Sequence, residues 1–592
     1  MMSVVDTKID EIRGLLKSPN QRPDSPELLL GDRFGEPFKL KGKQLHNSFH
    51  IMGATREGKS KQIENIYRQF IEQGIGGAII DPHGYLYDDL LAYCSYKSSR
   101  MPEILDRIIL FDPGDTENIV GFNTLQQLAG HEIDTLTLSR MYATIKARGK
   151  DTFDDMPTAK TWLQNIFHPL IKNGLTLIEA KHLIDRGSSD SEISRAIVSG
   201  SGIDLIEHDW SWYEDQSKRI QYEELLSSVN MLRSFVTSKR MEMIFGRKDS
   251  VLDLRKIMDE GKILLVNLSS RTIHQDIARL LGTLLVNEFF LTAKMRPKHS
   301  RPFYLAIDEF ENYVTQDVAD VLDQGPKFGI HLILAHHSLE QLREQNQKVY
   351  AAVMQNAKIK IIYGGLTYEN SEILIKELFS YRGRGGLDPK EIKRIQKSPY
   401  LEPTETTRTV VSEGIGESES SSQGTHSGHV LQTGNTTIPV DDIFMSDQMT
   451  SSMSSSSSMS SKGESEAQGF SHSHTESVVP FIMQELKWYI SGIQYYSLEE
   501  QVYRAIARMK NLPQQICMVK LPKEPVRIIK TKHVEEYYEM DNELEEFANH
   551  VNQLSPYHMT PIEASEERKR IAMRVIEGIE SEQIDDEDDR WQ

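Results

Sequence analysis

The sequence predicts an α/β fold with a doubly wound, mostly parallel sheet, an inserted all-α domain and a disordered serine-rich insertion. Three observations predict this fold. From residue 47 onward, apolar runs of strand length alternate with stretches of helical periodicity. Residues 126–258 lose the strand pattern and keep only helical spacing. Residues 402–479 are rich in serine and poor in apolar residues, so they cannot bury enough surface to offset the entropy of ordering.

The first strand and helix of the pattern flank a glycine loop. Its sequence, GATREGKS, fits the phosphate-binding pattern G-x-x-x-x-G-K-[ST]. An apolar strand at 48–52 precedes it and a helix at 61–73 follows, so backbone N–H groups and the helix dipole point at one place and favour an anion. We expect ATP as the ligand, with Lys59 at the β- and γ-phosphates and Ser60 on Mg²⁺. The loop residues expected to bind the nucleotide are Gly53, Ala54, Thr55, Arg56, Glu57, Gly58, Lys59 and Ser60.

Composition limits the class of protein. With 592 residues, several domains are expected. No apolar run reaches 18 residues and no signal peptide is recognisable, so we expect no membrane insertion. Two cysteines fit a reducing cytoplasm rather than a disulfide scaffold. The net charge of −19 excludes a uniformly basic nucleic-acid binder but not a ring with a basic pore.

The chain divides by composition and periodicity into successive segments. We expect an N-terminal segment with a short hairpin (1–45), the first part of the P-loop core (46–127), an all-α inserted domain (128–258), the second part of the core (259–401), the disordered serine-rich segment (402–479), a return to the core with a hairpin (480–535), and C-terminal helices with an acidic tail (536–592). Trp162, Trp210, Trp212 and Tyr213 are expected to form the core of the all-α domain; an aromatic platform for nucleic acid is the alternative.

A second motif completes a hydrolytic site. The apolar run 303–307 leads into Asp308 and Glu309. In a P-loop enzyme an acid at this position holds Mg²⁺, which we assign to Asp308, and the next acid can polarise the attacking water, which we assign to Glu309. His337 ends the following strand run, where a side chain could sense the γ-phosphate or simply cap the strand end. Asp81 and His83 also follow a strand, which we expect beside the P-loop strand.

These motifs together resemble the HerA/FtsK group of P-loop motors, and especially the cytoplasmic ATPase of type IV secretion coupling proteins. The resemblance covers about residues 28–400 and is carried by an ordered set of stretches: 53–60, 79–84, 110–113 with 121–123, 263–269, 306–309 and 328–336. It implies a RecA-like core, a homohexameric ring, ATP bound between subunits, and DNA threaded through a central pore.

The chain departs from the pattern of that group at three positions. Arg56 stands where the group often has glycine, and His337 stands where it has glutamine. Pro326 precedes Lys327 where the group tends to have Arg-Lys, so Lys327 is left as the cation that serves the nucleotide, without a guanidinium fork. Arginines that could act on a neighbouring subunit's nucleotide are Arg271, Arg382 and Arg384.

The leading hypothesis is a cytoplasmic hexameric ATPase of the DNA translocase or helicase type. By analogy with similar ATPases of bacterial defence operons, it would act against phage together with an effector partner, a nuclease or a sirtuin-like protein. Two alternatives stay open. One is an ATP-dependent assembly scaffold for an effector with little translocation. The other is a soluble coupling ATPase of a conjugative or mobile element.

Overall fold

The structure is a computed structural model of the chain, and it forms two compact units. Unit 1 comprises Met1–Asp388 with Leu498–Gln592, and unit 2 comprises Pro389–Ser497. The structure describes residues 26–126, 132–147, 157–184, 190–236, 238–248, 251–314, 317–379, 392–416, 429–436, 451–458, 471–537 and 541–573.

A mixed sheet forms the centre of unit 1. The strands that pair in parallel are β3 (Phe49–Met52), β4 (Gly76–Asp81), β5 (Ile108–Phe111), β7 (Ile263–Asn267), β8 (Phe303–Ile307), β9 (Ile330–His336) and β10 (Ile359–Ile362). Antiparallel strands extend the sheet beyond β10: β15 (Ile516–Lys520), β16 (Arg527–Thr531), β1 (Glu27–Arg33) and β2 (Glu36–Lys41). Among the described residues, eleven strands follow the order β2-β1-β16-β15-β10-β3-β9-β8-β4-β7-β5.

Helices cover both faces of the sheet, because alternate residues of each buried strand point to opposite sides. Ile263 and Leu265 pack into the core that contains α2 (Lys59–Gln73) and α3 (Tyr85–Ser98). Leu264 and Val266 pack into the core that contains α12 (Gln275–Lys294) and the inserted helices. The predicted doubly wound α/β class is therefore confirmed.

The strand order corrects one expectation. Asp81 and His83 do not lie beside the P-loop strand, because β9 and β8 stand between β3 and β4. Apolar periodicity identifies buried parallel strands but does not determine their order in the sheet. The two residues nevertheless lie at the carboxyl edge of the sheet, where the ends of β3, β8 and β9 also lie.

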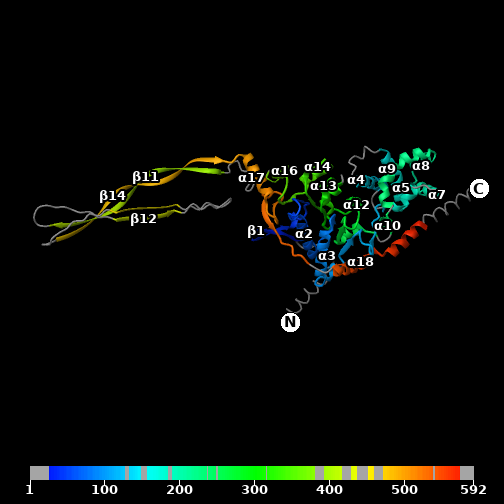
Figure 1. The fold of residues 1–592 in the computed structure, drawn as a ribbon, viewed down its shortest axis with the longest axis horizontal. Helices are drawn as coiled ribbons and strands as arrows, with labels where there is room; N and C mark the ends of the chain where they lie inside the picture. Colours follow the sequence, from blue (N-terminus) through cyan, green and yellow to red (C-terminus); the bar gives the residue numbers. More distant parts are fainter. Residues whose placement is uncertain are drawn as a thin grey trace, which may run out of the picture. The chain divides into compact units, whose positions relative to one another are not determined.

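The inserted helices lie within residues 133–147, 157–184, 190–236 and 238–245, and Figure 1 shows them grouped at one side of unit 1 in blue to green colours. Trp162, Trp210 and Tyr213 meet edge to face in their core, with ring centroids 4.9–5.6 Å apart. Trp212 is half exposed, which corrects its predicted place in this core. Positions 210 and 213 share a helix face and position 212 does not. The helices are α4 (Ile133–Ala147), α5 (Pro157–Lys172), α6 (Ala180–Ile184), α7 (Asp190–Ser199), α8 (Asp204–Glu214), α9 (Lys218–Val236) and α10 (Lys239–Phe245).

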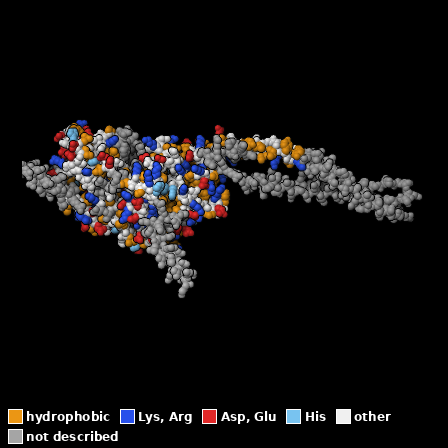
Figure 2. Space-filling view, turned by 180° about the vertical axis from the view of Figure 1, so that it is seen from behind, with side chains coloured by type: hydrophobic (Ala, Val, Ile, Leu, Met, Phe, Trp, Pro, Cys, Tyr) orange, Lys and Arg blue, Asp and Glu red, His pale blue; other side chains and the backbone are white. Residues whose placement is uncertain are grey.

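The C-terminal segment packs back onto unit 1. Strand β17 (His558–Met559) pairs with β6 (Ile119–Val120), and Glu567 forms a buried ion pair with Arg247 at 3.3 Å. Figure 2 shows acidic and basic side chains intermixed over the visible face of this unit. Its remaining helices are α11 (Leu254–Glu260), α13 (Asp317–Gln324), α14 (Leu339–Gln345), α15 (Gln347–Asn356), α16 (Tyr368–Leu378), α17 (Leu498–Lys510) and α18 (Asp541–Leu554), with the 3-10 helices η1 (Gly42–Gln44), η2 (Pro102–Ile104), η3 (Leu177–Glu179), η4 (Phe310–Tyr313) and η5 (Gly325–Phe328).

Unit 2 consists of antiparallel strand pairs. The long strands β11 (Ile392–Gly416) and β14 (Ser471–Tyr495) pair along their length, and β12 (His429–Thr436) pairs with β13 (Ser451–Ser458). The sequence predicts disorder for 402–479, whereas the described parts of that segment have ladder geometry. A ladder satisfies backbone N–H and C=O groups without an apolar core, so serine-rich composition does not prevent it. The other parts of the predicted segment, 417–428, 437–450 and 459–470, lie outside the described residues.

No helix in the described part of the chain is both long enough and apolar enough to cross a membrane.

Candidate nucleotide-binding site

The glycine loop lies between β3 and α2, as its sequence predicts. Gly58 has φ +113°, which only glycine adopts readily, and Arg56 takes the left-handed conformation at φ +68°. A side chain at Gly53 would place its Cβ 2.6 Å from Cβ of Tyr363. The two glycines of the motif are thus needed for different reasons, which are close packing at Gly53 and backbone conformation at Gly58.

Lys59 lies over this loop. Its Nζ atom donates hydrogen bonds to the carbonyl oxygens of Gly53 and Ala54, at 2.8 and 3.0 Å, and lies 3.0 Å from Nδ1 of His337. Burial lowers the pKa of the ammonium group, while the carboxylates of Asp308, Glu311 and Glu309 oppose that shift. The side chain is therefore a positive charge in a partly dry position at the loop, as a phosphate ligand requires.

The predicted metal ligands are in direct contact. The hydroxyl group of Ser60 donates to Oδ2 of Asp308 at 2.9 Å, although the two residues are 248 positions apart. Asp308 follows the last residue of β8 and is buried. A hydroxyl and a carboxylate oxygen at one point are the hard donors that Mg²⁺ prefers, so these residues fit the ion that the motif implies.

Glu309 leaves the strand through a sharp turn. Its backbone has φ 47° and ψ 50°, an uncommon conformation for a residue with a side chain. Oε1 of Glu309 lies 2.6 Å from Nε2 of His83 and 3.7 Å from Nε2 of His337. Because an ionised carboxylate only accepts hydrogen bonds, Nε2 of His83 carries the proton. The turn therefore brings the predicted base between two imidazoles.

The two histidines change the acidity of this carboxyl group. His337 and His83 lower the pKa of Glu309 to about 2, although partial burial acts in the opposite direction. The contact with Glu309 raises the pKa of His337. Burial disfavours the charged form of His83, but its bond to Glu309 outweighs burial and raises its pKa. A carboxylate with such a low pKa is a weak base while both imidazoles are protonated.

Asp81 positions His83. Its two carboxylate oxygens accept hydrogen bonds from the backbone N–H groups of His83 and Tyr87, both at 2.9 Å. These bonds fix the turn between β4 and α3. The side chain is almost fully buried, and burial raises its pKa. The structure thus gives Asp81 a place behind His83 rather than at the loop.

Two further residues at this site were not predicted. Asn312 donates from Nδ2 to Oε2 of Glu309 at 3.1 Å. Glu311 is buried near Lys59, burial raises its pKa, and within the described residues its Oε2 atom has no hydrogen-bond partner. The helical turn η4 after Glu309 brings both residues to the site. The available signal was the three-residue spacing between Glu309 and Asn312, which places both on one side of such a turn.

His336 belongs to a different environment from His337. Its Nε2 atom lies 2.6 Å from Nε2 of His50, and the two rings stack in the interior between β3 and β9. Nδ1 of His336 lies 3.2 Å from the carbonyl oxygen of Ser338 and therefore carries a proton, so in the neutral ring Nε2 accepts from His50. Burial lowers the pKa of His336 to about 4 and lowers that of His50 as well.

The structure does not bring Lys327 to the glycine loop. Lys327 lies in η5, before the first residue of β9, whereas His337 follows the last residue of the same strand. A seven-residue strand spans roughly 20 Å. Lys327 is exposed at that opposite edge, away from the glycine loop of its own chain, and its role in binding a nucleotide stays a prediction. The number of residues between Asp308 and Lys327 did not reveal which edge of the sheet Lys327 occupies.

Of the three candidate arginines, Arg271 lies within the described residues. Arg271 donates to Oδ2 of Asp88 at 3.0 Å and to the carbonyl oxygen of His83 at 3.3 Å, and its guanidinium lies over the ring of Tyr85. It therefore supports the same turn as Asp81. Arg382 and Arg384 lie outside the described residues.

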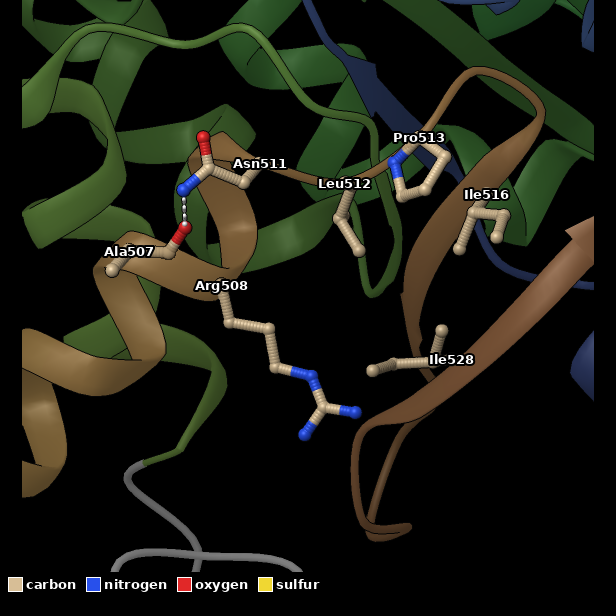
Figure 3. A pocket seen from close by; sticks show the side chains of 7 residues that line it. All are labelled: Ala507, Arg508, Asn511, Leu512, Pro513, Ile516 and Ile528. Atoms are coloured by element: carbon tan, nitrogen blue, oxygen red, sulfur yellow. Dashed lines mark hydrogen bonds between the residues drawn. The ribbon is translucent and has the colours of Figure 1, made fainter. Parts of the chain in front are cut away.

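A cavity of about 490 Å³ lies between α17 and the β15–β16 hairpin. Figure 3 shows Arg508 extending toward Ile528 across a space bordered by Leu512 and Ile516. None of the predicted site residues lines it. Leu512 nevertheless contacts Gly364, whose carbonyl oxygen accepts a hydrogen bond from the backbone N–H of Ala54 at 3.1 Å. The cavity is thus a neighbour of the loop rather than its phosphate site.

No protein-family model matches this chain, and no curated protein matches it either. Solved structures do match its fold. The bacterial conjugative coupling protein TrwBdeltaN70, in its unbound form, is 14% identical with a TM-score of 0.50, over 88% of this chain and 92% of the other. The plasmid coupling protein TrwB in complex with the non-hydrolysable ATP analogue ADPNP is 13% identical with a TM-score of 0.50, over 88% and 93%. The chain therefore has the fold of a P-loop ATPase.

Proposed function

We propose that this protein is an ATPase that binds ATP and Mg²⁺ at the glycine loop and uses hydrolysis to move along or remodel DNA. The observation that carries the proposal is the 2.9 Å contact between Ser60 and Asp308, with Glu309 next in the chain. A phosphate-binding loop alone would support binding. The two acids at its open side add the groups that hydrolysis needs.

Each residue has a distinct task in this proposal. Lys59 and the loop backbone bind the phosphates, and Ser60 and Asp308 hold Mg²⁺, which would neutralise phosphate charge when bound. Glu309 orients the attacking water and accepts its proton. His83 and His337 hold the carboxylate in place, and Asn312 fixes its second oxygen.

DNA handling and a homohexameric ring are the finer part of the proposal. They are supported by the motif set shared with HerA/FtsK motors and by the likeness of fold to a conjugative coupling protein. The position of Lys327, at the sheet edge opposite the loop, fits a residue that serves the nucleotide of a neighbouring subunit. Arg271 would do so only after leaving Asp88.

Turnover and binding measured separately test the ATPase proposal. Glu309→Gln should keep affinity for a fluorescent ATP analogue and lose roughly a hundredfold or more of the turnover, since the base is removed and the phosphate ligands stay. Lys59→Ala should lose binding as well. Unchanged turnover in Glu309→Gln would refute the assigned base. Added DNA should stimulate the wild type, and mass photometry with ATP reports the ring.

A scaffold with slow turnover is the second candidate function. It is favoured by the contacts of Glu309, whose Oε1 atom lies 2.6 Å from Nε2 of His83 and 3.7 Å from Nε2 of His337, so two imidazoles compete for the carboxylate that hydrolysis requires. Tight ATP binding, ATP-dependent assembly and turnover that DNA does not change would support the scaffold over the motor.

The biological setting is the last part of the proposal. An effector partner such as a nuclease or sirtuin-like protein, acting in cytoplasmic antiphage defence, follows from analogy with similar ATPases. A coupling ATPase of a mobile element is the alternative, and the TrwB fold supports it. Co-purification of the tagged chain from cells distinguishes a bound effector from components of a conjugation apparatus.

A further inference from the structure

The cavity of about 490 Å³ beside α17 has the size and the lining of a small-molecule site. Its walls are mostly apolar and include Leu512, Ile516 and Ile528, with Arg508 and Asn511 as the two polar side chains. Nδ2 of Asn511 donates to the backbone at 2.9 Å, whereas Arg508 extends into the space (Figure 3). Apolar pockets of roughly 300–1,000 Å³ with few polar groups are typical binding sites for small organic molecules. The cavity is therefore large enough for a nucleobase.

The segment that lines the cavity after α17 is attached to the glycine loop on both sides. The backbone N–H of Gly365, in the turn that contacts Ala54, donates to the carbonyl oxygen of Lys510 at 3.2 Å. At the other end of the segment, Nε2 of Gln514 donates to the carbonyl oxygen of Arg56 at 3.4 Å. The lining residues between these two contacts therefore lie directly beside the loop.

The cavity also lies on the appropriate side of the loop. In the sheet, β9 and β8 lie on one side of β3, where Asp308 and Glu309 follow β8, whereas β10 and β15 lie on the other side. Met518 pairs with Ile362, the last residue of β10, so Ile516 reaches past the carboxyl end of that strand. A nucleotide whose γ-phosphate lies at the two acids extends its base away from them, along the carboxyl edge toward the cavity.

We propose that this cavity binds the purine base of the nucleotide whose phosphates lie on the glycine loop. The inference rests on the proposed binding of ATP at that loop. Leu512, Ile516 and Ile528 cover one face of the ring and exclude water from it. Arg508 extends across the space, so its planar guanidinium stacks on the other face (Figure 3). The base is thus held through its faces.

A small ligand unconnected to the loop is the rival occupant, and the observations favour it less. Among the described residues that line the cavity, Arg508 carries the only charge, so an independent ligand would find few groups to fix its orientation. A base joined to phosphates on the loop needs fewer such groups. Its phosphates already hold it beside the cavity and raise its effective concentration there.

Calorimetry of the full chain with Mg²⁺ and either ATP or inorganic tripolyphosphate tests the proposal. ATP should bind roughly tenfold or more tightly than tripolyphosphate, because only ATP buries an apolar ring in the cavity. Ala507→Phe fills the cavity from an exposed helix position, so it should lower the affinity for ATP roughly tenfold and leave that for tripolyphosphate unchanged. The control Ala351→Phe, at an exposed alanine of α15, should bind both compounds like the wild type.

Two further measurements separate a base site from a phosphate site. Arg508→Ala should weaken ATP binding roughly threefold to fivefold, the range of an exposed cation–π contact. It should not change tripolyphosphate binding, which the loss of a phosphate ligand would weaken. Irradiation with 2-azido-ATP, whose reactive group is on the base, should label peptides that contain Leu512, Ile516 or Ile528, and excess tripolyphosphate should prevent the labelling.

Several outcomes would overturn the base site. They are equal affinity of the wild type for ATP and tripolyphosphate, wild-type ATP affinity in Ala507→Phe, an equal loss of both affinities in Arg508→Ala, labelling of other peptides, or labelling that excess tripolyphosphate does not prevent. Failure of the ATPase proposal gives a different result. In that case neither ATP nor tripolyphosphate binds to the wild type, and Lys59→Ala changes neither measurement.

Discussion

The Nε2 atom of His83 lies 2.6 Å from the Oε1 atom of Glu309, although 226 positions separate the two residues. The contact joins the turn after β4 to the turn after β8. It occupies the oxygen that would accept a proton from water. Turnover at this site should therefore depend on the charge of the imidazoles as well as on the carboxylate.

The pH dependence of turnover follows from these shifts. His83 and His337 have pKa values raised from 6.5, so both stay protonated to higher pH than usual and hold the pKa of Glu309 to about 2. As pH rises through the raised values, the cations are lost and Glu309 becomes a stronger base. We expect turnover at saturating ATP and Mg²⁺ to increase over that range. A rate that falls there would contradict the assignment.

The histidine contribution to stability should fall with rising pH over the same pH range in which turnover increases. The histidine contribution is fully present below the unfolded pKa of 6.5 and is lost as pH rises through the raised folded values. The contribution of Glu309 is present above its ordinary 4.5 and is lost as pH falls toward about 2. Thermal unfolding across the pH range measures both, and His83→Gln should reduce both.

His83→Gln should also change the kinetics. The substitution removes one cation and keeps a hydrogen-bond donor for Glu309. The pKa of Glu309 should therefore rise, and the increase of turnover should begin at a lower pH than in the wild type. The control is His208→Gln, an exposed histidine of α8 in the inserted helices. If both variants keep the pH profile of the wild type, His83 has no influence on the base.

Ser60→Ala and Asp308→Asn should raise the Mg²⁺ concentration needed for half-maximal turnover. Each variant removes one oxygen ligand that the 2.9 Å contact places at the same point. Glu340→Gln is the control, a carboxylate on α14 outside the contact. Titration of Mg²⁺ at fixed ATP measures this concentration. An unchanged midpoint in both variants would contradict the assignment of Ser60 and Asp308 as Mg²⁺ ligands.

Gly58→Ala should weaken nucleotide binding through the backbone. The loop needs φ +113° at this position, and an alanine there costs more than about 1 kcal/mol. Gly74→Ala is a matched control, because Gly74 also has positive φ (+72°) but caps the far end of α2. Both should lower stability by similar amounts, and only Gly58→Ala should lower ATP affinity.

The buried pair of Arg247 and Glu567 should fix the C-terminal segment to the inserted helices. Glu567→Ala leaves a buried cation without its carboxylate, which costs about 3–5 kcal/mol. The control is Glu223→Ala in the exposed pair with Arg219, worth about 0.5 kcal/mol or less. Urea unfolding gives both values. A small loss in Glu567→Ala would mean that the segment contributes little to the fold.

Much of the core could be predicted from the sequence, because buried parallel strands are continuous apolar runs. Strand β4 (Gly76–Asp81) is such a run, and Asp308, which follows the run 303–307, lies against Ser60 as expected. The order of strands could not be predicted, since every buried run has the same pattern. For the same reason the edge of the sheet at which Lys327 lies could not be predicted.

Contacts between turns also could not be predicted from the sequence. His83 was identified as a polar residue at a strand end, but its partner Glu309 depends on a left-handed backbone that no residue type announces. Asn312 and Glu311 enter the site through a single helical turn. The serine-rich segment was judged by its lack of apolar residues, a measure that does not report backbone pairing.

The dipeptide His336-His337 places two adjacent imidazoles on opposite sides of one strand end. Burial lowers the pKa of the first to about 4, and Glu309 raises the pKa of the second. In a proton NMR titration, neighbouring residues should therefore give one imidazole signal that does not move near neutral pH and one that does. The moving signal would report the charge state of the hydrolytic site without any nucleotide present.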